Sequence, residues 1–153
     1  MSSCKSSRSA KIVTKKSKVE ANTATSSIAN SVVSNAISFD GVRYKYGGTT
    51  RKGMDCSGLI YTAFANEDIA LPRVSRDMAK KGIRIRLNQV GKGDLIFFKT
   101  TKSRNVINHV GLVTSTSNGN IKFIHATSSK GVITSSLSEH YWKSSFVEAR
   151  RIL

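Results

Sequence analysis

Hydrophobic residues change their spacing once along the chain, and this change limits the folds available to it. Up to about residue 65 they recur at helical intervals, whereas beyond residue 83 they form short runs separated by glycine, asparagine and other polar residues. Helices that come first and strands that follow pack as segregated layers, unlike the alternating units of a parallel sheet. The sequence therefore predicts an α+β domain with N-terminal helices packed on a C-terminal antiparallel sheet.

Two longer helices are predicted in the first half of the chain. The first begins after Ser26 or Ser27 and ends before Gly41. Its apolar positions share one face: Ile28, Val32, Val33, Ala36 and Ile37. The second covers residues 55–64, has Asp55 in the N-cap position, and follows a glycine-containing loop. Its apolar face consists of Leu59, Ile60, Ala63 and Phe64. A short helix around residues 76–81, capped by Ser75, is expected next.

Five strands are predicted in the second half, over residues 95–98, 110–114, 121–125, 132–134 and 146–152. The dipeptide Asn118-Gly119, which is typical of tight β-hairpins, separates the second strand from the third.

Length and composition indicate the domain organisation. The 153 residues are enough for one domain, and we expect residues 1–25, rich in serine, lysine and threonine, to be a disordered leader before a domain at 26–153.

The net charge of +16 favours a polyanionic partner, such as nucleic acid, anionic lipid or an acidic wall polymer. Because no nucleic-acid-binding motif accompanies the charge, nucleic acid is not the expected partner.

Three residues carry the predicted chemistry. Cys56 falls in the first turn of a predicted helix, where the partial positive charge of the helix N-terminus favours a thiolate nucleophile. The alternative is a small buried cysteine with a structural role. His109 opens one strand of the predicted hairpin and His125 closes the next, so the two are candidates for a base and the group that orients it. Taken singly, each histidine fits a partly exposed surface residue better than a site residue, and only the two together on one hairpin after the cysteine favour the catalytic interpretation. No zinc, phosphate-loop or EF-hand motif is present, so we expect neither metal nor cofactor.

The hairpin register tests this interpretation. A strict two-residue turn at Asn118-Gly119 would place His109 and His125 on opposite faces of the sheet. A three-residue loop or a β-bulge would place them on the same face. The proposed chemistry therefore predicts one of these irregularities.

Taken together, several segments resemble the NlpC family of papain-like cell-wall peptidases over about residues 28–153. They are Tyr44, Asp55-Cys56-Ser57-Gly58, Leu71-Pro72-Arg73, Gly93-Asp94-Leu95-Ile96-Phe97-Phe98, His109-Val110-Gly111 and His125-Ala126. Other stretches, among them Gly41-Val42-Arg43-Tyr44 and Tyr141-Trp142-Lys143, resemble the Spr-type murein endopeptidases of that family.

The resemblance implies a permuted papain-like fold that hydrolyses peptidoglycan stem peptides. It implies that Cys56 is the nucleophile, His109 the base and His125 the orienting residue. Tyr44 would help to stabilise the oxyanion, and Asp55 and Ser57 would receive polar groups of the substrate. The Spr-type likeness favours the D-Ala–diaminopimelate cross-link, and the wider family favours the γ-D-Glu–diaminopimelate bond within one stem. A related amidase or acyltransferase, and a non-catalytic basic wall-binding protein, are the alternatives.

The segment Ser2-Ser3-Cys4, followed by a polar stretch, resembles the start of a mature bacterial lipoprotein. We therefore expect Cys4 to be a lipidation site that anchors a monomeric domain to a membrane of the bacterial cell envelope, with secretion as the other location. An ordinary cysteine in a polar tail is the alternative.

Overall fold

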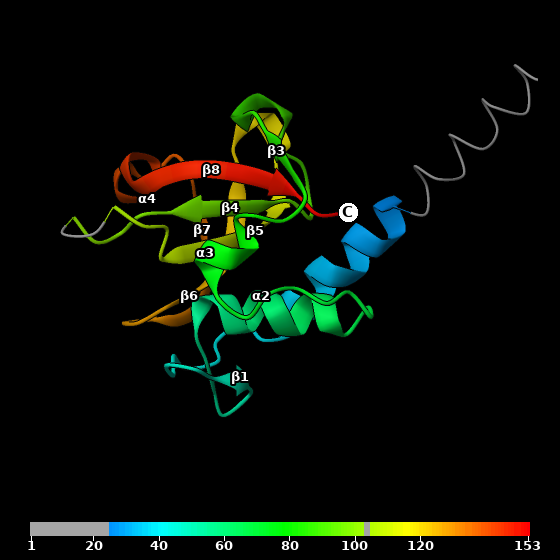
Figure 1. The fold of residues 1–153 in the computed structure, drawn as a ribbon, viewed down its shortest axis with the longest axis vertical. Coiled ribbons are helices and arrows are strands. Elements are labelled where there is room, and N and C mark those ends of the chain that lie inside the picture. Colours follow the sequence, from blue (N-terminus) through cyan, green and yellow to red (C-terminus); the bar gives the residue numbers. More distant parts are fainter. Residues whose placement is uncertain (1–24, 103–104) are drawn as a thin grey trace, which may run out of the picture.

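The computed structural model describes residues 25–102 and 105–153. Six antiparallel strands form the main sheet in the order β3-β8-β4-β5-β6-β7, and the N-terminal helix and the helix that begins at Cys56 cover one of its faces (Figure 1). The strands are β3 (Ile83–Ile85), β4 (Leu95–Phe98), β5 (His109–Ser115), β6 (Lys122–Thr127), β7 (Gly131–Ser136) and β8 (Phe146–Arg151). A separate pair, β1 (Thr49–Thr50) and β2 (Gly53–Met54), lies in the loop before helix α2 (Cys56–Ala65). The predicted α+β class is confirmed.

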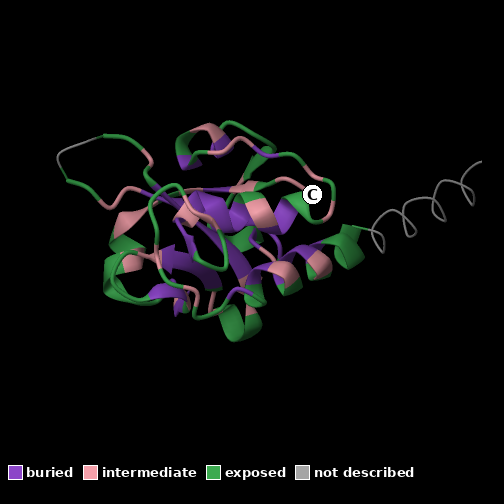
Figure 2. Cartoon of the chain, turned by 90° about the horizontal axis from the view of Figure 1, so that it is seen from below, coloured by how far each residue is buried: buried purple, intermediate pink, exposed green. Residues whose placement is uncertain are grey.

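Both faces of the sheet are buried, and each has its own hydrophobic cluster. The larger cluster lies between the sheet and the helices, and includes Leu59 and Phe64 of α2 together with Phe97 and Leu112 of the strands. The smaller cluster is on the opposite face and includes Phe98 and Phe123, which are fully buried. Figure 2 shows buried residues concentrated in the middle of the domain. Because side chains alternate along a strand, neighbouring residues of β4 and β5 serve different clusters.

The N-terminal helix, described over residues 25–37, buries most of the predicted face, but two of the five predicted residues lie outside it. Its buried residues are Ala29, Val32, Val33 and Ala36. Ile28 and Ile37 are 40% and 49% exposed, so their assignment to the apolar face was wrong. The reason is a close contact at Gly93, where an added Cβ would lie only 2.9 Å from the Cβ of Ala29. The small side chain of Ala29 therefore faces the domain, and the bulkier isoleucine beside it does not.

Short elements account for the other differences. Helix α3 (Ser75–Met78) begins one residue earlier and ends sooner than predicted, and Val74, rather than Ser75, is its N-cap. Helix α4 (His140–Ser145) was not predicted, nor were β1, β2 and β3. These elements have two to six residues, which is too few for a periodic pattern to show. None of the described helices is long and apolar enough to cross a membrane. The predicted leader lies almost entirely outside the described residues, as does Cys4.

The β5–β6 hairpin contains the predicted bulge. Leu112 pairs with Ile124 and Val113 with Phe123, and the register then shifts before Ser115 pairs with Lys122. The shift occurs next to the turn at Ser117–Gly119, where Asn118 adopts a left-handed conformation with φ of 57°. His109 and His125 consequently point to the same face of the sheet.

Candidate active site

Cys56 is the first residue of α2, and the preceding residue fixes the start of this helix. Asp55 is the predicted N-cap, and its Oδ1 accepts a hydrogen bond of 2.7 Å from the Gly58 backbone N–H. Its other oxygen, Oδ2, accepts a 2.8 Å hydrogen bond from the Gly47 N–H. These bonds satisfy one free amide of the helix end and tie the preceding loop to it. The Cys56 thiol is half-buried. Its Sγ lies 3.8 Å from the backbone oxygen of Asn108, which accepts a hydrogen bond from the S–H group.

Arg73 holds both neighbours of the cysteine. Its Nη1 donates a 2.8 Å hydrogen bond to Ser57 Oγ, and its Nη2 lies 3.1 Å from Asp55 Oδ1. Neither Asp55 nor Ser57 lines the cleft that Cys56 faces, and both are buried. Their contacts fix the start of α2, while the substrate-receiving role assigned to them from the resemblance stays a prediction.

The two predicted histidines are in direct contact. His109 Nε2 lies 2.8 Å from His125 Nδ1, and the rings meet nearly edge-on at an interplanar angle of 77°. His125 Nε2 in turn lies 2.8 Å from the hydroxyl of Ser135 on β7. The three side chains therefore form a continuous hydrogen-bonded row across β5, β6 and β7. His125 is completely buried and His109 is 8% exposed.

Aromatic rings enclose this row. The indole of Trp142 stacks on His109, with ring centroids 5.2 Å apart and planes 21° from parallel. It also meets His125 edge-on at 4.6 Å, and Phe123 lies 4.5 Å from the same histidine. These contacts exclude water from most of both imidazoles and hold their orientation.

Burial shifts the acid–base behaviour of the cysteine and the histidines toward their neutral forms. Desolvation lowers the pKa of His109 to about 4. Desolvation, together with repulsion from His109, lowers the pKa of His125 to about 3. Burial raises the pKa of the Cys56 thiol, and the charge of Asp55 adds to this effect, although backbone hydrogen bonds from Val110, Ser57 and Cys56 act against it. The free protein thus favours a neutral thiol beside a neutral imidazole.

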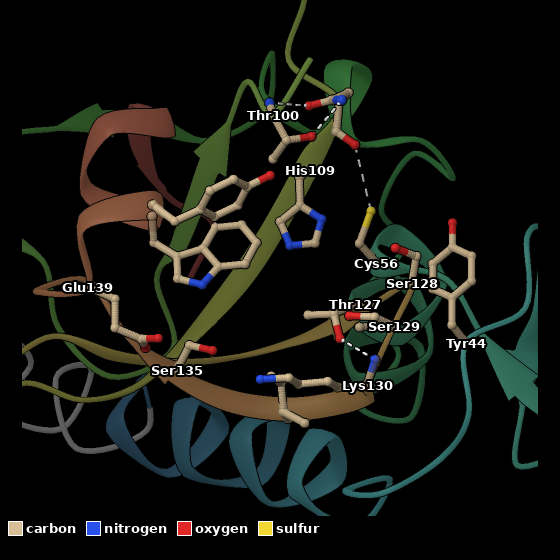
Figure 3. A pocket seen from close by; sticks show the side chains of 15 residues that line it. Tyr44, Cys56, Thr100, His109, Thr127, Ser128, Ser129, Lys130, Ser135 and Glu139 are labelled. Atoms are coloured by element: carbon tan, nitrogen blue, oxygen red, sulfur yellow. Dashed lines mark hydrogen bonds between the residues drawn. The ribbon is translucent and has the colours of Figure 1, made fainter. Parts of the chain in front are cut away.

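A cleft of about 400 Å³ brings the candidate reactive groups together (Figure 3). Cys56 and His109 face each other across it, and Tyr44 lies beside the cysteine. Burial raises the pKa of the Tyr44 hydroxyl, as does the nearby Cys56, so this group remains a hydrogen-bond donor. The lining also includes Ser135, Glu139, Tyr141 and Trp142, together with residues 127–130 at the end of β6 and just after it.

Several residues of this site were not identified in the sequence. Ser135, Trp142 and Arg73 were not given a role there, and Trp142 entered only as part of a segment that resembles the Spr-type murein endopeptidases. A signal existed for Ser135: with a regular hairpin after β6, residues 125 and 135 share a face of the sheet. No comparable pattern pointed to the ring stacking of Trp142. Within the described residues, no group of three or more His, Cys, Asp or Glu side chains could hold a metal ion.

A helix that begins at a cysteine and packs on an antiparallel sheet bearing a histidine is the architecture of the papain-like cysteine peptidases. Residues 41–151 match the model of the NlpC/P60 family. The chain belongs to this family, which confirms the predicted family and fold.

Curated relatives agree with this assignment. The chain is 43% identical over 116 residues to the probable endopeptidase NlpC of Escherichia coli, a match that spans 75% of this chain and 72% of that protein. It is 40% identical over 114 residues to the E. coli murein DD-endopeptidase MepS/murein LD-carboxypeptidase, spanning 74% of this chain and 57% of the relative. A gamma-DL-glutamyl hydrolase of Bacillus subtilis is 39% identical over 144 residues, spanning 92% of this chain and 33% of that protein.

A solved structure has the same fold. An NlpC/P60 family protein from Bacillus cereus superposes with a TM-score of 0.74 at 28% identity, covering 82% of this chain and 40% of the other. The chain therefore spans less than half the length of that protein.

Proposed function

We propose that this domain hydrolyses amide bonds of peptidoglycan stem peptides through a covalent thioester on Cys56, with His109 as base and His125 as the residue that orients it. The observation that carries the proposal is the arrangement at the start of β5. There a helix-borne thiol faces a histidine whose far nitrogen is held, at 2.8 Å, by a second histidine. A binding protein has no need for such a buried, solvent-excluded imidazole pair beside a thiol.

The enzyme class predicted from the sequence, a peptidoglycan hydrolase of the cysteine type, is confirmed by the family and by the murein endopeptidases among its relatives. A related amidase or acyltransferase is therefore the less favoured assignment. The residues that carry out the reaction, and the bond that is cut, belong to the proposal.

The reaction has two halves. As the thiol attacks the amide carbon, its proton moves to His109 Nδ1, the ring nitrogen that His125 does not engage. The resulting imidazolium then gives this proton to the leaving amine, the C–N bond breaks, and a thioester joins the acyl group to Cys56 Sγ. Water, deprotonated by His109, attacks the thioester; the acid is released and the proton returns to the thiol. Because the Cys56 thiol and the His109 imidazole are both neutral in the free protein, separated charges develop only after substrate has bound.

The oxyanion that forms on the amide oxygen needs hydrogen-bond donors to stabilise it. The Cys56 backbone N–H at the start of α2 is available to the substrate, because Asp55 Oδ1 accepts its hydrogen bond from the Gly58 N–H instead. Tyr44 lines the same cleft and keeps its proton because of its raised pKa. Together they form the proposed oxyanion hole.

Among stem-peptide bonds, the D-Ala–diaminopimelate cross-link is our first assignment, since the murein DD-endopeptidase is 40% identical. The second candidate is the γ-D-Glu–diaminopimelate bond, which the 39% identity to a gamma-DL-glutamyl hydrolase supports. Either substrate carries carboxylates, which suit the net charge of +16. A cell-envelope or secreted location follows from such a substrate. Membrane anchoring through a lipidated Cys4, and a monomeric state, remain predictions.

Digestion of purified, cross-linked peptidoglycan tests this proposal, with products identified by mass spectrometry and Cys56→Ala as the inactive reference. Conversion of dimeric muropeptides to intact monomers would establish the cross-link as the substrate. Stems shortened to dipeptides would establish the γ-D-Glu–diaminopimelate bond instead. If the wild type yields neither product while still sedimenting with the polymer, the domain is a wall-binding protein and the proposal is wrong.

A further inference from the structure

The row of hydrogen bonds behind the cysteine does not stop at the second histidine. Ser135 Oγ lies 2.8 Å from His125 Nε2, and the serine is 8% exposed. Its position follows from the β6–β7 register: Ile133 pairs with His125, and Ser135, two residues further along, faces the same side of the sheet. A hydroxyl at this point can either accept a proton from the imidazole or donate its own.

These two choices have opposite consequences for the nitrogen near Cys56. If Ser135 donates to His125 Nε2, then His125 Nδ1 carries a proton and donates to His109 Nε2. His109 must then carry its own proton on Nδ1, and it cannot accept another from the thiol. If Ser135 accepts, every bond in the row reverses: His125 Nε2–H donates to the serine, His109 Nε2–H donates to His125 Nδ1, and His109 Nδ1 has a free lone pair.

We propose that Ser135 is a positioning residue that accepts the hydrogen bond from His125 Nε2 and thereby keeps His109 in the tautomer able to take the Cys56 proton. The location of Ser135 permits this role, because the residue also lines the cleft. Its hydroxyl hydrogen can point toward water or substrate there, which leaves its lone pairs for the imidazole. The inference rests on the proposed function, in which His109 is the base.

Loss of the hydroxyl would leave a buried imidazole N–H without its acceptor. His125 is completely buried, and a buried donor left without its partner is costly. Ser135→Ala should therefore move the pair toward the other tautomer, in which His125 Nε2 is unprotonated. Outer partners that orient functional histidines typically change activity about 10- to 100-fold when removed, and a fall of this size in kcat is expected.

The tautomer can be observed directly, without substrate. The full chain contains only three histidines, so ¹⁵N-histidine labelling reports on His109, His125 and the exposed His140. In the wild type, His109 should show a protonated Nε2 and an unprotonated Nδ1 near neutral pH. Ser135→Ala should populate the form with protonated Nδ1 and lower kcat about 10-fold or more, with little change in KM. Ser135→Thr, which keeps the hydroxyl, should show the wild-type tautomers and the wild-type kcat.

Thr134→Ala is the matched control, because Thr134 is the exposed neighbour on the same strand and points to the other face. It should leave the tautomers and kcat unchanged. A wild-type His109 protonated on Nδ1 would overturn the inference, and so would a loss of kcat in Ser135→Ala with unchanged tautomers. The expected tautomers in a protein that cuts no peptidoglycan would uphold the hydrogen-bonded row while refuting the proposed function.

Discussion

The nitrogen of His109 that faces away from the cleft lies 2.8 Å from Nδ1 of His125, and both imidazoles are buried. This contact commits His109 to the use of its other nitrogen toward Cys56. The cysteine and the histidine come from different layers. Cys56 packs with the helix-side cluster, and His109 contacts Phe98 on the opposite face of the sheet. They meet at the N-terminal end of β5, where the cleft opens.

The neutral state of this pair predicts how the thiol reacts with an alkylating agent. Because burial raises the pKa of Cys56 and lowers that of His109 to about 4, a thiolate–imidazolium pair is disfavoured in the free protein. In Cys4→Ala protein, the rate of alkylation by iodoacetamide should rise through the alkaline range and fall continuously toward acid. A rate that stays high and constant between about pH 5 and pH 8 would reveal a preformed ion pair, contrary to this expectation.

Stability should decrease as the solution becomes acidic. Both histidines have folded-state pKa values, about 4 and about 3, below the value of 6.5 for an unperturbed histidine. The unfolded chain therefore binds more protons below pH 6.5, and the free energy of unfolding falls as the pH drops from there toward 4. The slope should approach about 2.7 kcal/mol per pH unit if both groups contribute fully.

Urea denaturation at pH 7, 6 and 5 measures this slope. The variant His125→Asn should reduce it, whereas His140→Asn, at an exposed site, should not. A wild-type free energy of unfolding that does not change between pH 7 and pH 5 would show that the two imidazoles are not buried in neutral form.

Gly111 in β5 is expected to tolerate no side chain. A Cβ there would lie 2.6 Å from Cδ2 of Phe123, a fully buried ring that in turn packs 4.5 Å from His125. Gly111→Ala should cost about 1–3 kcal/mol of stability through overpacking, and should lower kcat by displacing the histidine pair. Thermal denaturation and peptidoglycan turnover measure the two effects.

Phe123→Leu provides the check on this explanation, because a smaller side chain relieves the overlap. The double variant Gly111→Ala/Phe123→Leu should be less destabilised than the two single changes together. Strict additivity would mean that the cost of Gly111→Ala arises elsewhere.

Arg73 should matter for activity although it lies outside the cleft lining. Its guanidinium contacts Asp55 and Ser57, the residues on either side of Cys56, in a partly exposed setting. Arg73→Ala should lower stability by about 1–2 kcal/mol and kcat more than KM, because the start of α2 loses its support. Arg76→Ala, at an exposed position on α3, is the control and should behave as wild type. Equal behaviour of the two variants would refute a supporting role for Arg73.

The fold was predictable from the sequence where patterns were long or chemically constrained. The buried face of α2, its Asp55 cap and the bulge in the β5–β6 hairpin all followed from residue spacing or from the requirement that two histidines share a face. In the N-terminal helix only the central residues of the predicted face are buried, because the edge of that face depends on the close approach of Ala29 to Gly93, which is a tertiary contact.

The surroundings of the site were less accessible to sequence reasoning. Trp142 lies on a helix of six residues, and its stacking on His109 depends on how that helix crosses the sheet. Ser135 was within reach, because the same register argument that joined the two histidines applies to the next hairpin. Local spacing thus predicts the candidate reactive groups, while the contacts around them come from elements brought together only by folding.

The central claim is that Cys56 is the nucleophile, and removing its sulfur tests this most directly. Release of muropeptides from purified peptidoglycan would be followed for wild type, Cys56→Ala and Cys4→Ala, with equal folding verified by circular dichroism and thermal denaturation. Cys4→Ala should match the wild type, and Cys56→Ala should lose turnover by at least about 1,000-fold, as expected when the attacking group of a covalent mechanism is deleted. Substantial release by a folded Cys56→Ala protein would contradict the account.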